Sequence, residues 1–404
     1  MNLKEMFNIN NRKKNDLFYT ILASMVGSAV LQLIAYPVIA NHFGIDTVGT
    51  ILFFMGIIYV VPQAIGHALS NTRLLIRKDQ DTTNGDYFLP LLFGAVVSFL
   101  SCVAVGYAVT NNLPFSAFYG VFSVLYMLKI YAGVEYRLAM DFKGLFVYYL
   151  ISAIGYLAGL VLYFVTDLWL MIFLVGEAAA LLFICIKGNI FKKVKKVLPS
   201  VFVAKTVAPF IWSAFIRDVV AQFDRVIIMP ILSPAVVTQY NAVSIVAKTM
   251  QVLVSPLNTL MMTYMTQRNW KLVKKTYHAI VMGCLGIGAV FYVLCLAVTP
   301  LFIRLFYPSV YDAIIAYSPA INLGLVLLFI SSLLMVVLMS QGELKEFSII
   351  QTIWGGGYIV AAFLATTSYG LWGLAFATIA ANGARFVLLL IVSNWKLKQK
   401  YDAR

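Results

Sequence analysis

The sequence predicts an all-α membrane protein with twelve transmembrane helices, and two observations lead to this fold class. Twelve apolar stretches, most of them about 20 residues or longer, fill the 404-residue chain. A helix of roughly 20 apolar residues is long enough to cross the ~30 Å hydrocarbon core of a bilayer. The composition agrees, because 62% of the residues are hydrophobic, only 11% are charged, and the mean hydropathy is +0.89.

The apolar stretches follow one another with almost no room for a soluble domain. In chain order the predicted helices cover residues 17–40, 47–70, 87–109, 113–137, 144–165, 168–187, 206–232, 236–262, 277–298, 318–340, 347–367 and 370–394. Such a composition lies far from that of soluble proteins. We therefore expect the function to be carried out within the bilayer.

The basic residues determine the orientation of these helices. Of the 30 Lys and Arg residues, 24 lie in the two tails and in the even-numbered loops, whereas the opposite side carries only Arg304. Short loops rich in Lys and Arg stay in the cytoplasm. We therefore expect a multi-pass protein of the bacterial cytoplasmic membrane with both termini in the cytoplasm. The net charge of +14 meets anionic lipid head groups there, not nucleic acid.

Two prolines recur at matched places in the two halves of the chain. Pro37 corresponds to Pro230 at an offset of 193 residues, and Pro62 corresponds to Pro256 at an offset of 194. A proline inside a spanning helix removes one backbone hydrogen bond and kinks the helix. The matched positions predict kinks in the first, second, seventh and eighth helices, and they indicate a duplicated chain.

The longest basic linker, residues 187–205, follows the sixth predicted helix and divides the chain near its middle. Each half then has an even number of helices, so both copies share one orientation. We predict two six-helix bundles, residues 1–195 and 196–404, related by a pseudo-two-fold axis along the membrane normal. Rocking of the bundles around a central cavity would expose a midplane site to each side of the membrane in turn.

Charged side chains at membrane depth are the strongest functional signal in the sequence. Each costs about 2.5–3.5 kcal/mol at the centre of a helix, so such residues line a cavity or pair with one another. The seventh helix holds the largest polar set: Arg217, Asp218, Gln222, Asp224 and Arg225. Asp218, Gln222 and Arg225 lie at i, i+4 and i+7 along one face, so this helix cannot face lipid all round.

Two hypotheses remain open for these charges and for Lys248, which lies near the midplane in the eighth helix. In the first, Lys248, Arg217 and Arg225 make the cavity positive for a pyrophosphate or acidic sugars. Arg forms bidentate contacts with phosphate, while Lys acts as a point charge. In the second, the charges pair internally, Asp218 with Lys248 and Asp224 with an arginine, and only hold helices together.

Isolated charges occur in three other helices. Arg385 in the twelfth helix either lines the cavity or extends to the cytoplasmic interface. Lys129 in the fourth helix is expected to line the cavity. Glu177 in the sixth helix either is a protonatable carboxylate that couples transport to an ion gradient or pairs with Lys129 or another cation.

A polar stripe follows the second helix. Gln63, His67 and Asn71 fall at i, i+4 and i+8 beside Pro62. These side chains either contact sugar hydroxyls or form hydrogen bonds between helices, which is the commoner use of such residues in membranes.

The sequence contains no phosphate-binding loop of an ATPase, no cluster with metal-ligand spacing and no nucleophile elbow. The outer loops are short, and the longest covers about residues 300–317. These features argue against an enzyme and against an ATP-driven motor. We expect no cofactor and no metal, and a secondary transporter whose energy comes from an H⁺ or Na⁺ gradient.

Four segments resemble Wzx-type polysaccharide flippases. The segment 222–248, which begins Gln222-Phe-Asp-Arg, is similar to the seventh and eighth helices of that family, with an Asp-centred helix, a short outer turn and a Tyr-containing helix start. The other three are the first hairpin around Tyr36-Pro37, Phe43-Gly44 and Val48-Gly49, the ninth-to-tenth helix junction at 300–313, and the inner loop at 341–345. The combination is typical of the multidrug/oligosaccharidyl-lipid/polysaccharide (MOP) exporter superfamily.

The resemblance implies a monomeric flippase that moves undecaprenyl-pyrophosphate-linked oligosaccharide repeat units to the outer leaflet by alternating access, for surface polysaccharide biosynthesis. Its implied partners are the lipid-linked oligosaccharide, membrane lipids, a polysaccharide polymerase and the chain-length machinery. Two alternatives stay open. One is a cation-coupled multidrug exporter of the same superfamily, although the excess of cations inside the spans disfavours an acidic cavity. The other is a polytopic polymerase or transferase, which the short outer loops oppose.

Overall fold

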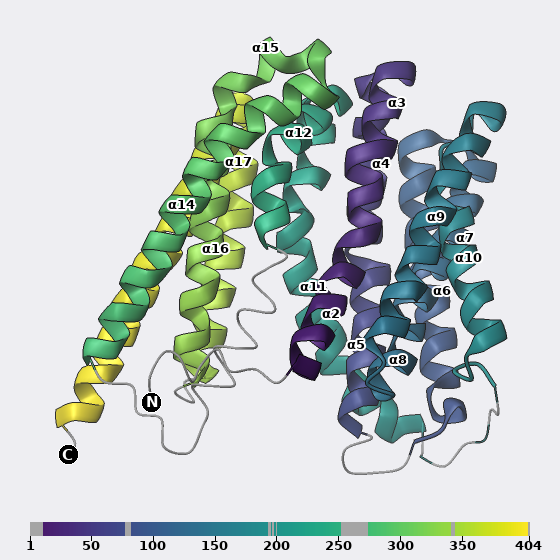
Figure 1. Cartoon of the computed structure of the whole chain (residues 1–404), viewed down its shortest axis with the longest axis horizontal. Coiled ribbons are helices and arrows are strands. Elements are labelled where there is room, and N and C mark those ends of the chain that lie inside the picture. The colour runs from purple at the N-terminus through teal and green to yellow at the C-terminus, as the bar shows by residue number, and fades with distance from the viewer. Residues whose placement is uncertain are drawn as a thin grey trace. The chain divides into compact units, whose positions relative to one another are not determined.

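The computed structural model describes residues 11–76, 82–192, 195, 198, 200–251, 274–340 and 344–402. It contains two compact units, a first unit of Asn10–Val226 and a second unit that includes Ile227–Arg404. Within each unit the helices run side by side as long rods (Figure 1).

The first unit contains most of the elements. They are α2 (Asn11–Val30), the π-helical turn η1 (Leu31–Ala35), α3 (Tyr36–Phe43), α4 (Ile45–Ile58), α5 (Val61–Ile76), η2 (Asn84–Tyr87), α6 (Phe88–Thr110), α7 (Leu113–Ala132), α8 (Val134–Leu138), α9 (Phe142–Thr166), α10 (Leu170–Lys187) and all of α11 (Ser200–Ile231) up to Val226. The second unit contains α12 (Pro234–Gln251), α14 (Lys274–Phe306), η3 (Pro308–Val310), α15 (Tyr311–Ile314), η4 (Ile315–Tyr317), α16 (Ser318–Ser340) and α17 (Leu344–Asp402).

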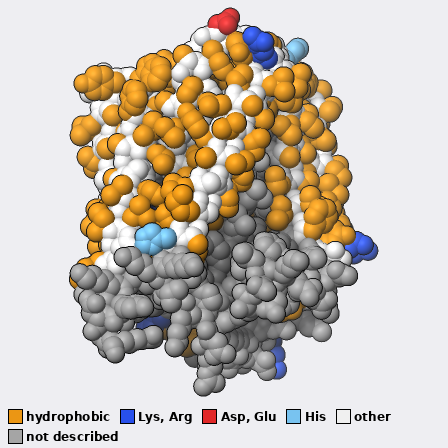
Figure 2. All heavy atoms as spheres, turned by 60° about the vertical axis from the view of Figure 1, so that its left-hand side comes forward, with side chains coloured by type: hydrophobic (Ala, Val, Ile, Leu, Met, Phe, Trp, Pro, Cys, Tyr) orange, Lys and Arg blue, Asp and Glu red, His pale blue; other side chains and the backbone are white. Residues whose placement is uncertain are grey.

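The predicted all-α membrane fold is confirmed. Every regular element within the described residues is a helix, and nine helical stretches there are long and apolar enough to cross a membrane. On the face drawn in Figure 2, hydrophobic side chains cover most of the described surface, as expected for a surface that meets lipid. The chain is therefore a multi-pass membrane protein.

Whether the chain has twelve spans depends on how α11, α12 and α17 are counted. One stretch, Ile349–Trp395, contains two of the predicted helices, which separate at Gly370, where φ is 59° and a residue without Cβ is favoured. The helices α11 and α12 are not among the nine stretches. The charges in the middle of α11 and the polar residues of α12 lower their hydropathy. The count of twelve therefore stays a prediction.

The prolines act differently in the helices that contain them. Pro37 lies at the start of α3, directly after the π-helical turn, where the Tyr36 N–H donates to the Leu31 carbonyl. Pro62 lies at the start of α5, after the helical path breaks between α4 and α5. Both positions suit a residue without an N–H, since the first turn of a helix leaves that donor unused.

The matched prolines of the second half do not repeat this arrangement within the described residues. Pro230 lies in the last turn of α11, which runs unbroken from Ser200 to Ile231. Pro256 lies outside the described residues. Pro300 is internal to α14, which continues to Phe306 instead of ending at the predicted residue 298. Short helical turns make up the rest of the predicted outer loop.

Side-chain hydrogen bonds fasten the basic linker to the first unit. The Glu135 carboxylate accepts the backbone N–H groups of Asn189 at 2.8 Å and Ile190 at 3.1 Å. The Asn84 amide donates to the Asn189 carbonyl at 2.7 Å, and Arg73 in turn donates to the Asn84 Oδ1 at 2.6 Å. These residues border a surface hollow of about 280 Å³. The linker is thus part of the first unit.

The start of α11 packs on the same unit. Asp86 accepts the Leu198 N–H at 2.7 Å, and α11 begins two residues later. Val203 and Val207 are buried in the hydrophobic cluster that also contains Tyr148. The boundary between the two units falls within α11, between Val226 and Ile227. The six-helix halves, residues 1–195 and 196–404, stay a prediction.

Replacing Glu135 with Ala should release the linker from the first unit. Hydrogen bonds to a charged acceptor are worth about 1.5–3 kcal/mol each, so the loss of both should speed tryptic cleavage between residues 187 and 198 by roughly tenfold or more. Cleavage in detergent micelles, followed by mass spectrometry, measures the rate. Asp46→Ala, at an exposed carboxylate in the first turn of α4, is the control. An unchanged rate in Glu135→Ala would contradict this account.

Candidate functional site

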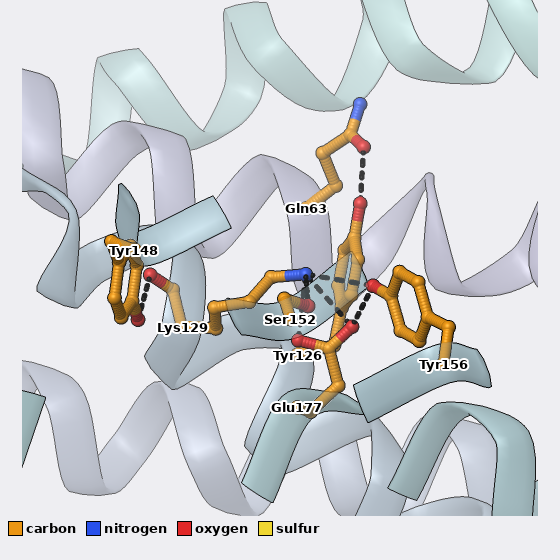
Figure 3. A network of polar contacts seen from close by, with 7 residues as sticks. All are labelled: Gln63, Tyr126, Lys129, Tyr148, Ser152, Tyr156 and Glu177. Carbon is orange, nitrogen blue, oxygen red and sulfur yellow. Dashed lines mark hydrogen bonds and ion pairs between the residues drawn. The ribbon is translucent and has the colours of Figure 1, made fainter. Parts of the chain in front are cut away.

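A buried ion pair lies at the centre of the first unit. Lys129 of α7 and Glu177 of α10 meet with the Lys129 Nζ 2.8 Å from the Glu177 Oε1 and 2.7 Å from Oε2. Their side chains are only 6% and 0% exposed. Figure 3 shows the pair among polar side chains from neighbouring helices. This is the pairing that the sequence offered as one of two roles for Glu177.

Helix α9 supplies the other polar partners of the pair. The Tyr156 hydroxyl donates to the Glu177 Oε1 at 2.6 Å, and the Lys129 Nζ donates to the Tyr156 and Ser152 oxygens at 3.0 and 3.5 Å. Tyr148, one helical turn before Ser152, donates to the Lys129 carbonyl at 3.1 Å. Three helices therefore contribute to one buried network.

Close helix packing brings these groups within reach of one another. A Cβ on Gly155 would lie 2.7 Å from the Gly176 Cα, and a Cβ on Gly159 would lie 2.5 Å from the Met171 carbonyl oxygen. Small residues allow membrane helices to approach in this way. The approach of α9 to α10 places Tyr156 beside Glu177.

Aromatic rings surround the Lys129 ammonium. Its Nζ lies 5.1 Å from the Tyr126 ring centroid, 5.8 Å from that of Tyr149 and 5.5 Å from that of Tyr156. Each ring attracts a cation through its quadrupole. The Tyr126 hydroxyl donates to the Gln63 Oε1 at 3.0 Å and so connects the network to α5.

The charges at the middle of α11 pair with each other. Arg217 donates to the Asp218 carboxylate at 2.9 and 3.3 Å, with the Arg217 side chain 57% exposed and that of Asp218 only 4% exposed. Further along, Arg225 donates from Nη1 to the Gln222 Oε1 at 3.2 Å, and its backbone N–H donates to the Asp224 carboxylate at 2.8 Å.

The second unit holds the other two cations predicted to line the cavity. Lys248 in α12 is half-buried, with its Nζ 4.9 Å from the Tyr240 ring centroid. Arg385 in α17 is 5% exposed. Among the described residues, no carboxylate lies within ion-pair distance of Arg385.

Neutral groups surround Arg385 instead. Its guanidinium lies 4.3 Å from the Trp354 ring centroid and donates to the Gln351 Oε1 at 3.1 Å and, more weakly, to the Ser332 Oγ at 3.5 Å. The Trp354 indole N–H donates to the Asn382 Oδ1 at 3.1 Å. A buried positive charge is thus held by an aromatic face, one amide oxygen and one hydroxyl oxygen.

The three side chains of the polar stripe on α5 lie in different surroundings. Gln63 takes part in a hydrogen bond between helices, as one of the two hypotheses predicts. His67 is half-buried, and Asn71 is exposed. Within the part of the chain that the structure describes, no group of three His, Cys, Asp or Glu side chains could hold a metal ion.

The aromatic partners of Lys129 were not predicted from the sequence. Tyr148, Ser152 and Tyr156 recur at i, i+4 and i+8 on α9, which is the spacing of the polar stripe on α5. Tyr126 precedes Lys129 by three residues on α7. Tyrosine is so common in this chain, with 23 in all, that these spacings did not stand out.

No family model and no curated protein sequence matches this chain. Solved structures do match it. An inward-facing multidrug resistance MATE family transporter of the MOP superfamily matches with a TM-score of 0.67 and 12% identity, over 98% of this chain and 96% of that chain. The MATE multidrug transporter DinF-BH, solved as a complex, matches with a TM-score of 0.67 and 15% identity, over 95% of each chain.

A third match is a MOP superfamily transporter from Pyrococcus furiosus Vc1 (DSM3638), with a TM-score of 0.59 and 13% identity over 95% of this chain and 96% of that chain. At these identities the likeness concerns the fold. This chain has the fold of the MATE transporters of the MOP superfamily. The narrower resemblance to Wzx-type flippases stays a prediction.

A double-mutant cycle should show that Lys129 and Glu177 are strongly coupled. Lys129→Met should destabilise the protein by about 3–5 kcal/mol, because it leaves a buried carboxylate without its cation. Lys129→Met/Glu177→Gln should recover most of that loss, since neither charge is then left unpaired. Unfolding of the purified protein in detergent measures both.

The control cycle uses Arg217→Gln and Asp218→Asn. Arg217 is largely exposed, so its coupling to Asp218 should be much smaller than that of the buried pair. Equal coupling energies in the two cycles would contradict the prediction that the buried Lys129–Glu177 pair is the more strongly coupled one.

Proposed function

We propose that this chain is a secondary transporter that carries an amphipathic substrate across the cytoplasmic membrane by alternating access. The observation that supports this most is its fold, which matches MATE transporters described in both inward-facing and outward-facing conformations. Those matches cover nearly all of this chain. The proposal includes two halves that rock around a central cavity, and both termini in the cytoplasm.

The matching structures favour a multidrug exporter as the particular kind of transporter. Both matches with a TM-score of 0.67 are described as multidrug or multidrug resistance transporters. On the comparisons alone, this hypothesis is better supported than a polysaccharide flippase. The multidrug-exporter hypothesis requires that a cationic or neutral amphiphile bind beside the charged residues inside the spans.

The buried charges favour an anionic substrate instead. Glu177 and Asp218 are each paired with a cation, so neither offers a free negative charge to a cationic drug. Arg385 is buried with no carboxylate in ion-pair distance among the described residues. A guanidinium held in this way suits a phosphate group. The transporter from Pyrococcus furiosus is itself described as having a binding pocket of reversed polarity that suggests a different function.

For this second hypothesis the substrate is an undecaprenyl-pyrophosphate-linked oligosaccharide. The pyrophosphate would be held by cations inside the spans, Arg385 among them, while the lipid tail stays in the bilayer. A polysaccharide polymerase and the chain-length machinery would receive the product outside. An H⁺ or Na⁺ gradient would supply the energy in either hypothesis, and a monomer would suffice.

Replacing Arg385 with Gln should distinguish the two substrates. If the substrate carries a phosphate, Arg385→Gln should lower the transport rate by roughly tenfold or more, because a charge-assisted contact worth about 1.5–3 kcal/mol is lost. In a strain without the natural copy, surface polysaccharide should fall and lipid-linked repeat units should accumulate in the inner leaflet. Arg304→Gln, at an exposed cation outside the predicted spans, is the control and should transport normally.

The same strains should be profiled for resistance to cationic drugs. A multidrug exporter would lose resistance on deletion of the gene and leave surface polysaccharide unchanged. If the Arg385→Gln protein, at normal expression, still supports full polysaccharide transport, the proposed contact between Arg385 and phosphate is contradicted.

A further inference from the structure

The surroundings of the Lys129 ammonium have the composition of a binding site for an organic cation. One carboxylate lies at 2.7 and 2.8 Å, the hydroxyl oxygens of Tyr156 and Ser152 lie at 3.0 and 3.5 Å, and three tyrosine rings lie between 5.1 and 5.8 Å. Proteins that recognise ammonium ligands use aromatic cages of this kind. A simple structural ion pair needs only the carboxylate.

The cage has supports that do not involve the Lys129 side chain. Tyr156 is hydrogen-bonded to Glu177 at 2.6 Å, and Tyr126 is hydrogen-bonded to Gln63 at 3.0 Å. The close approach of α9 to α10 holds Tyr156 beside Glu177 whatever occupies the centre. The cage should therefore keep its form when the Lys129 side chain is shortened.

The geometry also indicates which cation fits. A primary ammonium has three N–H donors, which match the Glu177 carboxylate, the Tyr156 oxygen and the Ser152 oxygen. A quaternary ammonium has no donor and would leave the buried carboxylate without a hydrogen bond from the ligand. Sodium prefers several oxygen ligands, whereas much of this cage is formed by rings.

We propose that Glu177, Tyr156, Ser152, Tyr126 and Tyr149 form a binding site for a primary alkylammonium, which the side chain of Lys129 occupies in this protein. Lys129 is thus a tethered ligand of the site. Because Lys129 already neutralises Glu177, the Glu177 carboxylate binds no cation from solution while Lys129 is in place.

This proposal is tested by truncating the Lys129 side chain and adding the removed part back as a free small molecule. Lys129→Ala removes three methylene groups and the amine, which together correspond to n-propylammonium. Propylammonium should raise the unfolding temperature of the purified full-length Lys129→Ala protein in a saturable way, because a ligand that binds the native state stabilises it. We expect it to recover most of the loss caused by the substitution. Wild-type protein, whose site is filled, should show no saturable rise.

Two controls separate binding from a general effect of amines or salt. Tetramethylammonium and sodium at equal ionic strength should not reproduce the rise. Lys129→Ala/Glu177→Gln, which lacks the carboxylate, should not respond to propylammonium. The proposal is overturned if Lys129→Ala shows no saturable rise, or if the double variant responds equally.

The test remains decisive if Lys129→Ala folds poorly. The yield of monodisperse protein on size exclusion is then compared between membranes solubilised with and without propylammonium. A higher yield with propylammonium, absent for the double variant, supports the site, and an unchanged yield overturns it. Binding is measured without transport, so the result is independent of the proposed function.

Discussion

The hydrocarbon core contains no water, so each polar group placed there must be satisfied by another part of the chain. This constraint explains the centre of the first unit. The Lys129–Glu177 pair needs α7 and α10 at one register, and the Tyr156 hydroxyl adds α9 to the same requirement. A shift of one residue along a helix moves a side chain by about 1.5 Å and turns it by roughly 100°. Such a shift would leave a buried charge unpaired, so the network specifies how these three helices pack.

The same constraint determines where α11 belongs. Its charged middle is costly to expose to lipid, and one apolar face of its first half, with Val203 and Val207, is buried against the first unit. The linker before it is held by Glu135, Asn84 and Asp86. The start of the helix predicted as seventh therefore packs on the unit formed by the helices before it. The charges of α11 up to Arg225 then belong to the first unit, and Lys248 and Arg385 belong to the second.

The charge balance of the interior does not follow from the shared fold. The matching MATE and MOP superfamily transporters have the fold of this chain at 12–15% identity, so the fold does not depend on most of the side chains inside it. Here the acids Glu177 and Asp218 are paired with cations, while Arg385 is held by an aromatic ring, one amide oxygen and one hydroxyl oxygen. The pairing of these charges is therefore decided by the side chains of this chain and not by its fold.

The sequence by itself determined the class of the protein, because hydrophobic length and loop charge act locally and can be read from short stretches. It located the helices to within a few residues in most places, and it identified Lys129, Glu177 and Arg385 as unusual. It did not show where within a helix a proline lies, as with Pro230, which is in the last turn of α11.

Only the tertiary structure decided which charges meet. Lys129 and Glu177 are 48 residues apart, and their pairing depends on how α7 packs against α10. The tyrosines around Lys129 come from α7 and α9, and no spacing along one helix shows that they converge. Packing also decided that the start of α11 joins the first unit, because the buried side chains of Val203 and Val207 hold it there.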